Sequence, residues 1–298
     1  MEEIRVNIKN CKAITDIISD RMPSLSFEVF PPKIESNFDS VDKAVKEISK
    51  LNPSYMSVTY GAGGGTSKYT VAIAEKLKNE YGVTALAHLT CVSSTRNEVH
   101  KKLEELKTRG ITNILALRGD LPEGFVAGSL DYTYASELIR EIKDFGGFCI
   151  GGACYPECHP ESKTIKEDIA HLKEKADLGC EFFTTQMFFD NNILYNFMYR
   201  IREAGVSVPV IPGIMPLTNT NQIVKTCKLS GQVLPPRFMR IVDRYGNNSL
   251  AMKQAGIAYA TEQIIDLYAN GFNAVHVYSM NHPDVAEKIQ ANVSEIIK

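Results

Sequence analysis

Residues 95–120 read TRNEVHKKLEELKTRGITNILALRGD and contain one complete helix-to-strand unit. Thr95 and Glu98 have the spacing of a capping box, in which a hydroxyl and a carboxylate pair with unsatisfied amides at a helix start. The helical stretch that follows ends at Gly110, and glycine readily adopts the left-handed conformation that closes many helices. The apolar run 113–117 then predicts a buried strand.

The same alternation recurs along the rest of the chain. Thr164 and Glu167 repeat the capping-box spacing, and Gly146 and Gly179 each separate a helical stretch from an apolar run. Strands are predicted over residues 25–30, 55–59, 84–89, 113–117, 148–153, 181–186, 208–212 and 274–277. Strands that alternate with helices indicate an α/β fold, and eight of them predict a (β/α)8 TIM barrel, formed by one domain over residues 1–298. A doubly wound open sheet is the alternative.

The last crossover, from about residue 218 to residue 271, is too long for one ordinary helix. It contains Pro235-Pro236 and Gly246-Asn247-Asn248, which interrupt helical structure. The sequence therefore predicts two helices with an irregular connection in this crossover.

Composition restricts the class of partner. The 298 residues carry 33 basic and 35 acidic side chains, a formal net charge of −2, with no long run of one sign. Nucleic acid and membrane surfaces are therefore not expected as partners. The start, MEEIRVNIKN, lacks the apolar core of a signal peptide, so a cytoplasmic location is expected. Seven scattered cysteines are then expected to be free thiols, and a homo-oligomer is one expected state.

Polar residues cluster where the predicted strands end, which is where a TIM barrel builds its active site. They are Glu28, Thr59, Tyr60, His88, Arg118-Gly119-Asp120, the segment from Tyr155 to His159, and Gln186. Packing alone does not explain this distribution, so the sequence predicts a functional site there.

Glu28 has apolar neighbours, with Phe27 and Phe30 beside it and Pro31-Pro32 after it. An apolar setting raises the pKa of a carboxyl group, so Glu28 is predicted to act as a general acid near neutral pH. The alternative is a carboxylate paired with a lysine or arginine inside the barrel.

The loop at residues 118–120 places a cation beside an anion. Arg118 could clamp a phosphate, and Asp120 could complement a cationic intermediate. The alternative is an internal pair between these two adjacent charges.

Two other motifs are weaker. Residues 61–68, GAGGGTSK, lack both nucleotide-binding fingerprints and are predicted to be a loop that approaches a flat ligand or moves over the site. Cys154, Cys158 and His159 form an incomplete zinc set, so no metal is predicted and His159 is expected to donate to a ligand. The remaining histidines, His276 among them, are expected to be surface or packing residues.

Six segments together resemble the methylenetetrahydrofolate reductase family, in its short bacterial form without a regulatory domain. They are SFEVFPPK (26–33), SVTYGAGG (57–64), LRGD (117–120), YPECHPE (155–161), TQMFFD (185–190) and IPGIMP (211–216). The segments follow the family order over nearly the whole chain.

The resemblance implies a barrel that binds FAD non-covalently and reduces 5,10-methylenetetrahydrofolate to 5-methyltetrahydrofolate, with NADH or NADPH as electron donor. It implies that Glu28 is the catalytic acid, that Asp120 lies between flavin and folate, and that Gln186 binds the pterin. The flavin contacts that it implies are Thr59, Tyr60, Ala62, His88, Arg118, Gly119, Asp120, Ala135, Tyr155, His159, Asp168 and Lys175.

One segment departs from the family pattern. After Pro216 the family carries an aromatic residue that stacks on nicotinamide or folate, whereas this chain continues with Leu217 and Thr218. The departure implies that NADH binds differently or that a partner protein reduces the flavin. A different class, a Schiff-base aldolase or lyase, would need a lysine at a strand end, and Lys33 lies beyond Pro31-Pro32.

Overall fold

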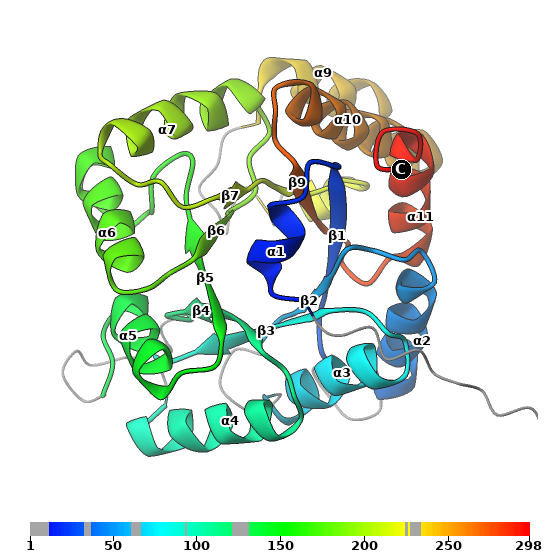
Figure 1. Cartoon of the computed structure of the whole chain (residues 1–298). Helices are drawn as coiled ribbons and strands as arrows, with labels where there is room; N and C mark the ends of the chain where they lie inside the picture. The colour runs from blue at the N-terminus through cyan, green and yellow to red at the C-terminus, as the bar shows by residue number, and fades with distance from the viewer. Residues whose placement is uncertain are drawn as a thin grey trace, which may run out of the picture.

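Parallel strands form a barrel at the centre of the molecule, and helices surround it (Figure 1). The structure is a computed structural model that describes residues 12–32, 37–60, 67–92, 94–120, 131–223, 226 and 234–298. Its strands are β1 (Ser24–Val29), β2 (Met56–Val58), β3 (Ala85–Thr90), β4 (Asn113–Leu117), β5 (Cys149–Cys154), β6 (Phe182–Thr185), β7 (Val210–Ile211), β8 (Gly213–Ile214) and β9 (Ala274–Tyr278). All eight predicted strands are present, and the seventh is divided into β7 and β8.

Pro212 divides the seventh strand because proline has no amide hydrogen to donate to the sheet. The strand order is β7-β6-β5-β4-β3-β2-β1-β9-β8, with β7 paired to β6 and β8 paired to β9. The carbonyl of Pro212 still accepts a hydrogen bond from the His276 amide at 2.9 Å. Since β7 and β8 are consecutive, they join the two edges of the sheet and close the barrel. The TIM barrel prediction is confirmed, and the open sheet is excluded.

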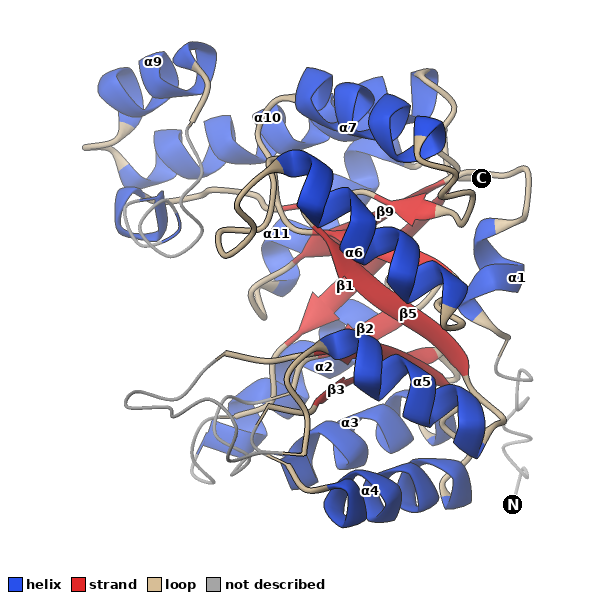
Figure 2. Ribbon diagram, turned by 90° about the vertical axis from the view of Figure 1, so that its left-hand side faces the viewer, coloured by secondary structure: helices blue, strands red, loops and turns tan. Residues whose placement is uncertain are grey.

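Within the described ranges, eight helices surround the barrel (Figure 2), and their apolar side chains pack against it. They are α2 (Phe38–Ser49), α3 (Ser67–Asn79), α4 (Arg96–Thr108), α5 (Ala135–Phe145), α6 (Ile165–Asp177), α7 (Asn191–Glu203), α10 (Ser249–Ala269) and α11 (Pro283–Val293). A further helix, α9 (Pro236–Tyr245), lies farther from the strands and packs against α10 through Phe238. The long crossover contains α9 and α10, joined through Gly246–Asn248, as predicted. Asn248 caps α10 by accepting a hydrogen bond from the Ala251 amide at 3.0 Å.

The two predicted capping boxes differ in outcome. Thr95 and Glu98 form the reciprocal pair at the start of α4. At the start of α6, Thr164 accepts from the Glu167 amide, but the Glu167 carboxylate accepts from the Lys163 amide, one residue before the predicted partner. Both amides precede the first helical turn and have no helical carbonyl to bond, so the carboxylate stabilises the helix start by pairing with either.

A short helix that the sequence analysis did not predict, α1 (Ile14–Ile18), closes the amino-terminal end of the barrel (Figure 1). Ile14 and Ile18 are buried among side chains from the barrel interior, including Tyr55 and Phe182. The Ile14 amide donates to Asn113 Oδ1 at 3.0 Å, which fixes the helix to β4. Because α1 fills this end, the carboxyl ends of the strands are left to form a ligand site.

Five cysteines within the described ranges are free thiols, as predicted: Cys91, Cys149, Cys154, Cys158 and Cys180. Among the helices of the described ranges, none combines the length and apolar character needed to cross a bilayer.

Candidate active site

A cavity of about 330 Å³ opens at the carboxyl end of the barrel. Eight of the predicted site residues line it: Glu28, Thr59, Tyr60, His88, Gly119, Asp120, Tyr155 and Gln186. They come from β1 to β6 or directly follow these strands, so the barrel brings together positions that are up to 158 residues apart, from 28 to 186. The predicted clustering of these eight residues is therefore present in the structure.

Glu28 lies near the end of β1, with only 7% of its surface exposed. The barrel register places it between Ser57 on β2 and Tyr278 on β9. Burial raises the pKa of the Glu28 carboxyl from 4.5 to about 8, so the group is mostly protonated at pH 7. No lysine or arginine is among the described residues that line the cavity. The alternative prediction, an ion pair of Glu28 inside the barrel, therefore has no cationic partner there.

His88 on β3 is an ionisable side chain close to Glu28, with its Nε2 3.6 Å from the carboxyl oxygen Oε2. Burial lowers the pKa of His88 to about 3, so its imidazole is neutral. A neutral imidazole beside a protonated carboxyl is not an ion pair. Glu28 therefore keeps its proton at neutral pH.

Two buried polar atoms around the cavity have no hydrogen-bond partner within the described chain: His88 Nε2 and Thr184 Oγ1. Buried polar atoms in folded proteins are nearly always hydrogen-bonded, and unsatisfied ones have a free-energy cost. Both residues line the cavity, so a bound ligand is the expected partner for each atom.

Asp120 lies exposed at the rim, directly after Arg118 and Gly119. The backbone turns at Gly119, where φ is 91° and a Cβ would lie 3.0 Å from the Thr90 side chain. The Arg118 carbonyl accepts hydrogen bonds from the amides of Cys91 and Val92, which fixes the loop to the end of β3. The glycine therefore brings the Asp120 carboxylate to the mouth of the cavity.

Five predicted flavin contacts within the described residues do not line the cavity: Ala135, Arg118, His159, Asp168 and Lys175. The last four form a polar cluster beside the cavity. Tyr155 connects this cluster to the cavity, since the Tyr155 ring contacts the His159 ring at 4.5 Å. Asp168 accepts from the His159 amide at 3.1 Å, and the Lys175 amine donates to the Ala153 carbonyl at 3.1 Å.

The guanidinium of Arg118 does not pair with Asp120, as one prediction allowed, but with Glu161. Both hydrogen bonds of this bidentate contact are 2.6 Å long. A guanidinium in this geometry suits a phosphate equally well. A bound phosphate would therefore replace the Glu161 carboxylate.

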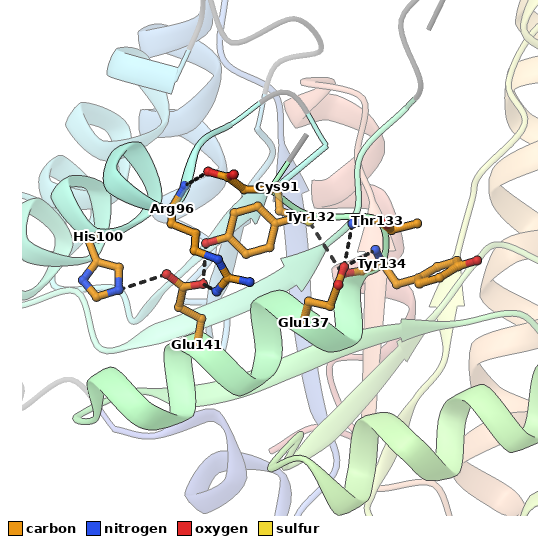
Figure 3. Close-up of polar contacts among 9 residues, drawn as sticks. Cys91, Arg96, His100, Tyr132, Thr133, Tyr134, Glu137 and Glu141 are labelled. Carbon is orange, nitrogen blue, oxygen red and sulfur yellow. Dashed lines mark hydrogen bonds and ion pairs between the residues drawn. The ribbon is translucent and has the colours of Figure 1, made fainter. Parts of the chain in front are cut away.

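Ala135, another predicted flavin contact, is the first residue of α5, whereas Ala62 lies outside the described residues. The segment before α5 is held by two carboxylates (Figure 3). Glu137 accepts from the amides of Thr133 and Tyr134. The buried Glu141 accepts from Arg96, from His100 and from the Tyr132 hydroxyl. These contacts join α4 to α5 and set the position of Ala135.

We expect Glu141→Gln to lower the free energy of unfolding by about 1–3 kcal/mol, because an amide cannot replace a buried carboxylate that accepts from three donors. Urea denaturation at pH 7 measures this loss. Asp144→Asn, an exposed acid on the same helix, is the matched control and should change stability by less than about 0.5 kcal/mol. Equal stability of both variants would refute a structural role for Glu141.

His276 corrects the expectation that this histidine is a surface or packing residue. It is 2% exposed, lines the cavity, and forms hydrogen bonds with Ser26 at 2.8 Å and Ser57 at 2.9 Å. Tyr278 and Thr184 also line the cavity and were not predicted. Positions 276 and 278 alternate along β9, in register with residues 26 and 28 on β1. This two-residue period was a signal for inward-facing polar residues.

Sequence comparisons with known proteins agree on one family. The sequence model of methylenetetrahydrofolate reductase matches residues 13–294. The 5,10-methylenetetrahydrofolate reductase of Escherichia coli is 34% identical over 266 residues, which cover 89% of each chain. Methylenetetrahydrofolate reductase (NADH) 1 of Zea mays is 31% identical over 305 residues, covering 97% of this chain and 51% of that protein. The chain thus spans about half the length of the plant relatives.

Among solved structures, a Clostridium thermocellum protein that binds two copies of 5-methyl-5,6,7,8-tetrahydrofolic acid has a TM-score of 0.63 at 15% identity. The match covers 96% of this chain and 99% of that one, and it shows a shared fold. The family match over almost the whole chain and the identity to full-length bacterial relatives lead to one conclusion: the chain belongs to the methylenetetrahydrofolate reductase family.

Proposed function

We propose that this chain reduces 5,10-methylenetetrahydrofolate to 5-methyltetrahydrofolate by hydride transfer from non-covalently bound FAD. The observation that carries the proposal is Glu28, a buried carboxyl that keeps its proton at pH 7 and lines the cavity. Opening of the substrate's imidazolidine ring needs a proton on a ring nitrogen, and a carboxyl with this pKa is a suitable donor.

The residues at the site fit a flavin. Leu115, Leu117 and Val92 give the cavity apolar walls suited to a flat ring, while His88 and Thr184 offer unpaired polar atoms. Thr59, Tyr60, Tyr155 and Gly119 would surround the ring, and Arg118, His159, Asp168 and Lys175 would hold the phosphates, ribose or adenine, with Ala135 and Ala62 nearby. When bound, FAD supplies the hydride.

The chain's own residues supply the proton and the electrostatics. Glu28 donates its proton to a nitrogen of the imidazolidine ring, which breaks the bond from that nitrogen to the methylene carbon and leaves an iminium cation on the substrate. Asp120 at the rim stabilises this positive charge. Gln186 binds the pterin; its Oε1 already accepts from the Met187 amide at 2.9 Å, so its amide hydrogens remain for the substrate.

Two kinds of electron donor could reduce the flavin. One is NADH or NADPH, and the other is a partner protein. Leu217, where the family has an aromatic residue, is 1% exposed and packs with Phe189, Phe238 and Met252. Met215 from the same segment lines the cavity instead, together with three tyrosines, Tyr60, Tyr155 and Tyr278. The tyrosines offer a stacking surface for nicotinamide, whereas the loss of the aromatic at position 217 favours a protein donor.

Anaerobic stopped-flow spectroscopy tests the proposal. The purified chain is expected to bind FAD and turn yellow, and its photoreduced flavin should be reoxidised by 5,10-methylenetetrahydrofolate with release of 5-methyltetrahydrofolate. A preparation that binds no FAD, or whose reduced flavin is not reoxidised by 5,10-methylenetetrahydrofolate, would contradict the proposed function. Mixing the oxidised flavoprotein with NADH or NADPH separates the donors, since slow bleaching with both points to a partner protein.

A further inference from the structure

A chain of buried hydrogen bonds leads from Glu28 to β9. Ser57 lies opposite Glu28 in the register of β1 and β2, hydrogen-bonds the Glu28 carboxyl, and also lies 2.9 Å from His276 Nε2. On the other side of the imidazole, Nδ1 lies 2.8 Å from Ser26 Oγ, and Ser26 Oγ lies 3.1 Å from the Val275 carbonyl. Ser26, Ser57 and His276 are all at most 2% exposed, so water does not compete for these contacts.

The direction of each hydrogen bond in this chain follows from its last acceptor. A carbonyl accepts only, so the Ser26 hydroxyl donates its single proton to Val275. Ser26 must then accept from His276 Nδ1. Burial lowers the pKa of His276 to about 3, so the ring is neutral and carries one N–H, which lies on Nδ1 because Ser26 accepts there.

The tautomer of His276 fixes the role of Ser57. With its proton on Nδ1, the imidazole presents Nε2 as an acceptor, and Ser57 must donate to it. The single proton of Ser57 is then in use. Towards Glu28, Ser57 offers a lone pair, which accepts from a carboxylic acid and has no proton to give to a carboxylate.

We propose that His276, acting through Ser57, keeps Glu28 in its protonated, proton-donating form. His276 is a positioning residue, since Ser57 lies between it and the acid. An ionised Glu28 could gain a hydrogen bond from Ser57 only if His276 lost one. The inference deepens the proposed function and rests on it for the use of the proton, but the protonation state itself is independent of any substrate.

The other titratable groups that face Glu28 do not oppose this arrangement. They are His88 on β3, Tyr55 before β2 and Tyr278 on β9, with the Asp120 carboxylate at the rim of the cavity. Burial keeps His88 neutral and raises the pKa of both tyrosines above 10, so none of these groups provides a positive charge that would favour the carboxylate.

The two possible roles of Ser57 predict opposite effects of Ser57→Ala. If Ser57 accepts from the acid, its removal lowers the pKa of Glu28, by about one pH unit. If Ser57 instead donates to the carboxylate, its hydrogen bond lowers the pKa of Glu28 against the larger effect of burial, and removal of Ser57 raises that pKa. His276→Phe keeps a ring between Tyr55 and Tyr278 but leaves the Ser57 proton free to donate to the Glu28 carboxylate. This variant should therefore lower the pKa of Glu28 at least as much as Ser57→Ala does.

Infrared titration of the purified protein, with and without FAD, measures this pKa through the carbonyl stretch of protonated Glu28, assigned by its loss in Glu28→Gln. Ser54→Ala is the matched control, because Ser54 also donates to a backbone carbonyl, that of Leu25, but does not contact His276. A lower pKa in Ser57→Ala with no change in Ser54→Ala supports the proposal. An unchanged or higher pKa in Ser57→Ala overturns it, even if His276→Phe does not fold, and neither result depends on turnover of a folate.

Discussion

Replacing Glu28 with glutamine is expected to lower the rate of folate reduction by about 10²–10⁴-fold while FAD binding persists. Glutamine has the shape of the protonated acid, but its amide has no acidic proton to transfer to the substrate. The cavity keeps its volume, and the unpaired atoms of His88 and Thr184 remain available to a flavin. The loss should therefore appear in the step that consumes the substrate.

The measurement is the single-turnover reoxidation of photoreduced flavin by 5,10-methylenetetrahydrofolate across a range of pH. The wild-type rate should fall as the pH rises through about 8, where Glu28 loses its proton, and the variant should lack this dependence. Glu157→Gln is the matched control, because burial also raises the pKa of Glu157 but the residue does not line the cavity. A Glu28→Gln enzyme with the wild-type rate would remove the acid role.

The barrel was predictable because its signals are local and repeated. Apolar runs, capping residues such as Thr95 and glycines such as Gly110 mark each unit independently, so one error does not spread. The helix α1 lacks these signals: it has five residues, and Ala13 at its start provides no side-chain cap. Its position depends on burial of Ile14 and Ile18 inside the barrel, which is a tertiary effect.

The site was predictable where polar residues interrupt apolar runs, and less so elsewhere. Glu28 and His88 are conspicuous within their strands, whereas the role of His276 depends on its register with Ser26 on β1. The register between distant strands is a property of the closed barrel. A sequence gives the inward-facing positions of each strand, but it does not give the partner across the sheet.

The family resemblance implies one ligand for Arg118, His159, Asp168 and Lys175, and the first, third and fourth of these residues are electrostatic neighbours of His159. Their roles as flavin contacts remain predictions. What no motif indicated is the bidentate pair of Arg118 with Glu161. That pair joins the loop after β4 to the loop after β5, in which Cys158 adopts a φ of 84°.

Glu28→Gln is further expected to make the protein more stable at pH 7, in contrast to Glu141→Gln. Glu141 accepts from three donors, so loss of its charge removes contacts. Among the described residues that line the cavity, none is a lysine or arginine beside Glu28. Burial raises the pKa of Glu28 from 4.5 to about 8, so the folded state binds a proton that the unfolded state releases above pH 4.5. Wild-type stability therefore falls as the pH rises from about 4.5 to about 8.

The glutamine variant has no proton to lose at this position and escapes that decrease. Its stability relative to the wild type should rise by about 3 kcal/mol between pH 4.5 and pH 7, from 1.36 kcal/mol for each pH unit over which the folded state alone stays protonated. Urea denaturation of both proteins at several pH values measures the difference, in which the other titrating groups cancel. Glu157→Gln, at a half-buried carboxyl, should show the same sign with a smaller slope. A difference that does not change with pH would mean that Glu28 is ionised in the folded protein, and the carboxyl could then not be the proton donor.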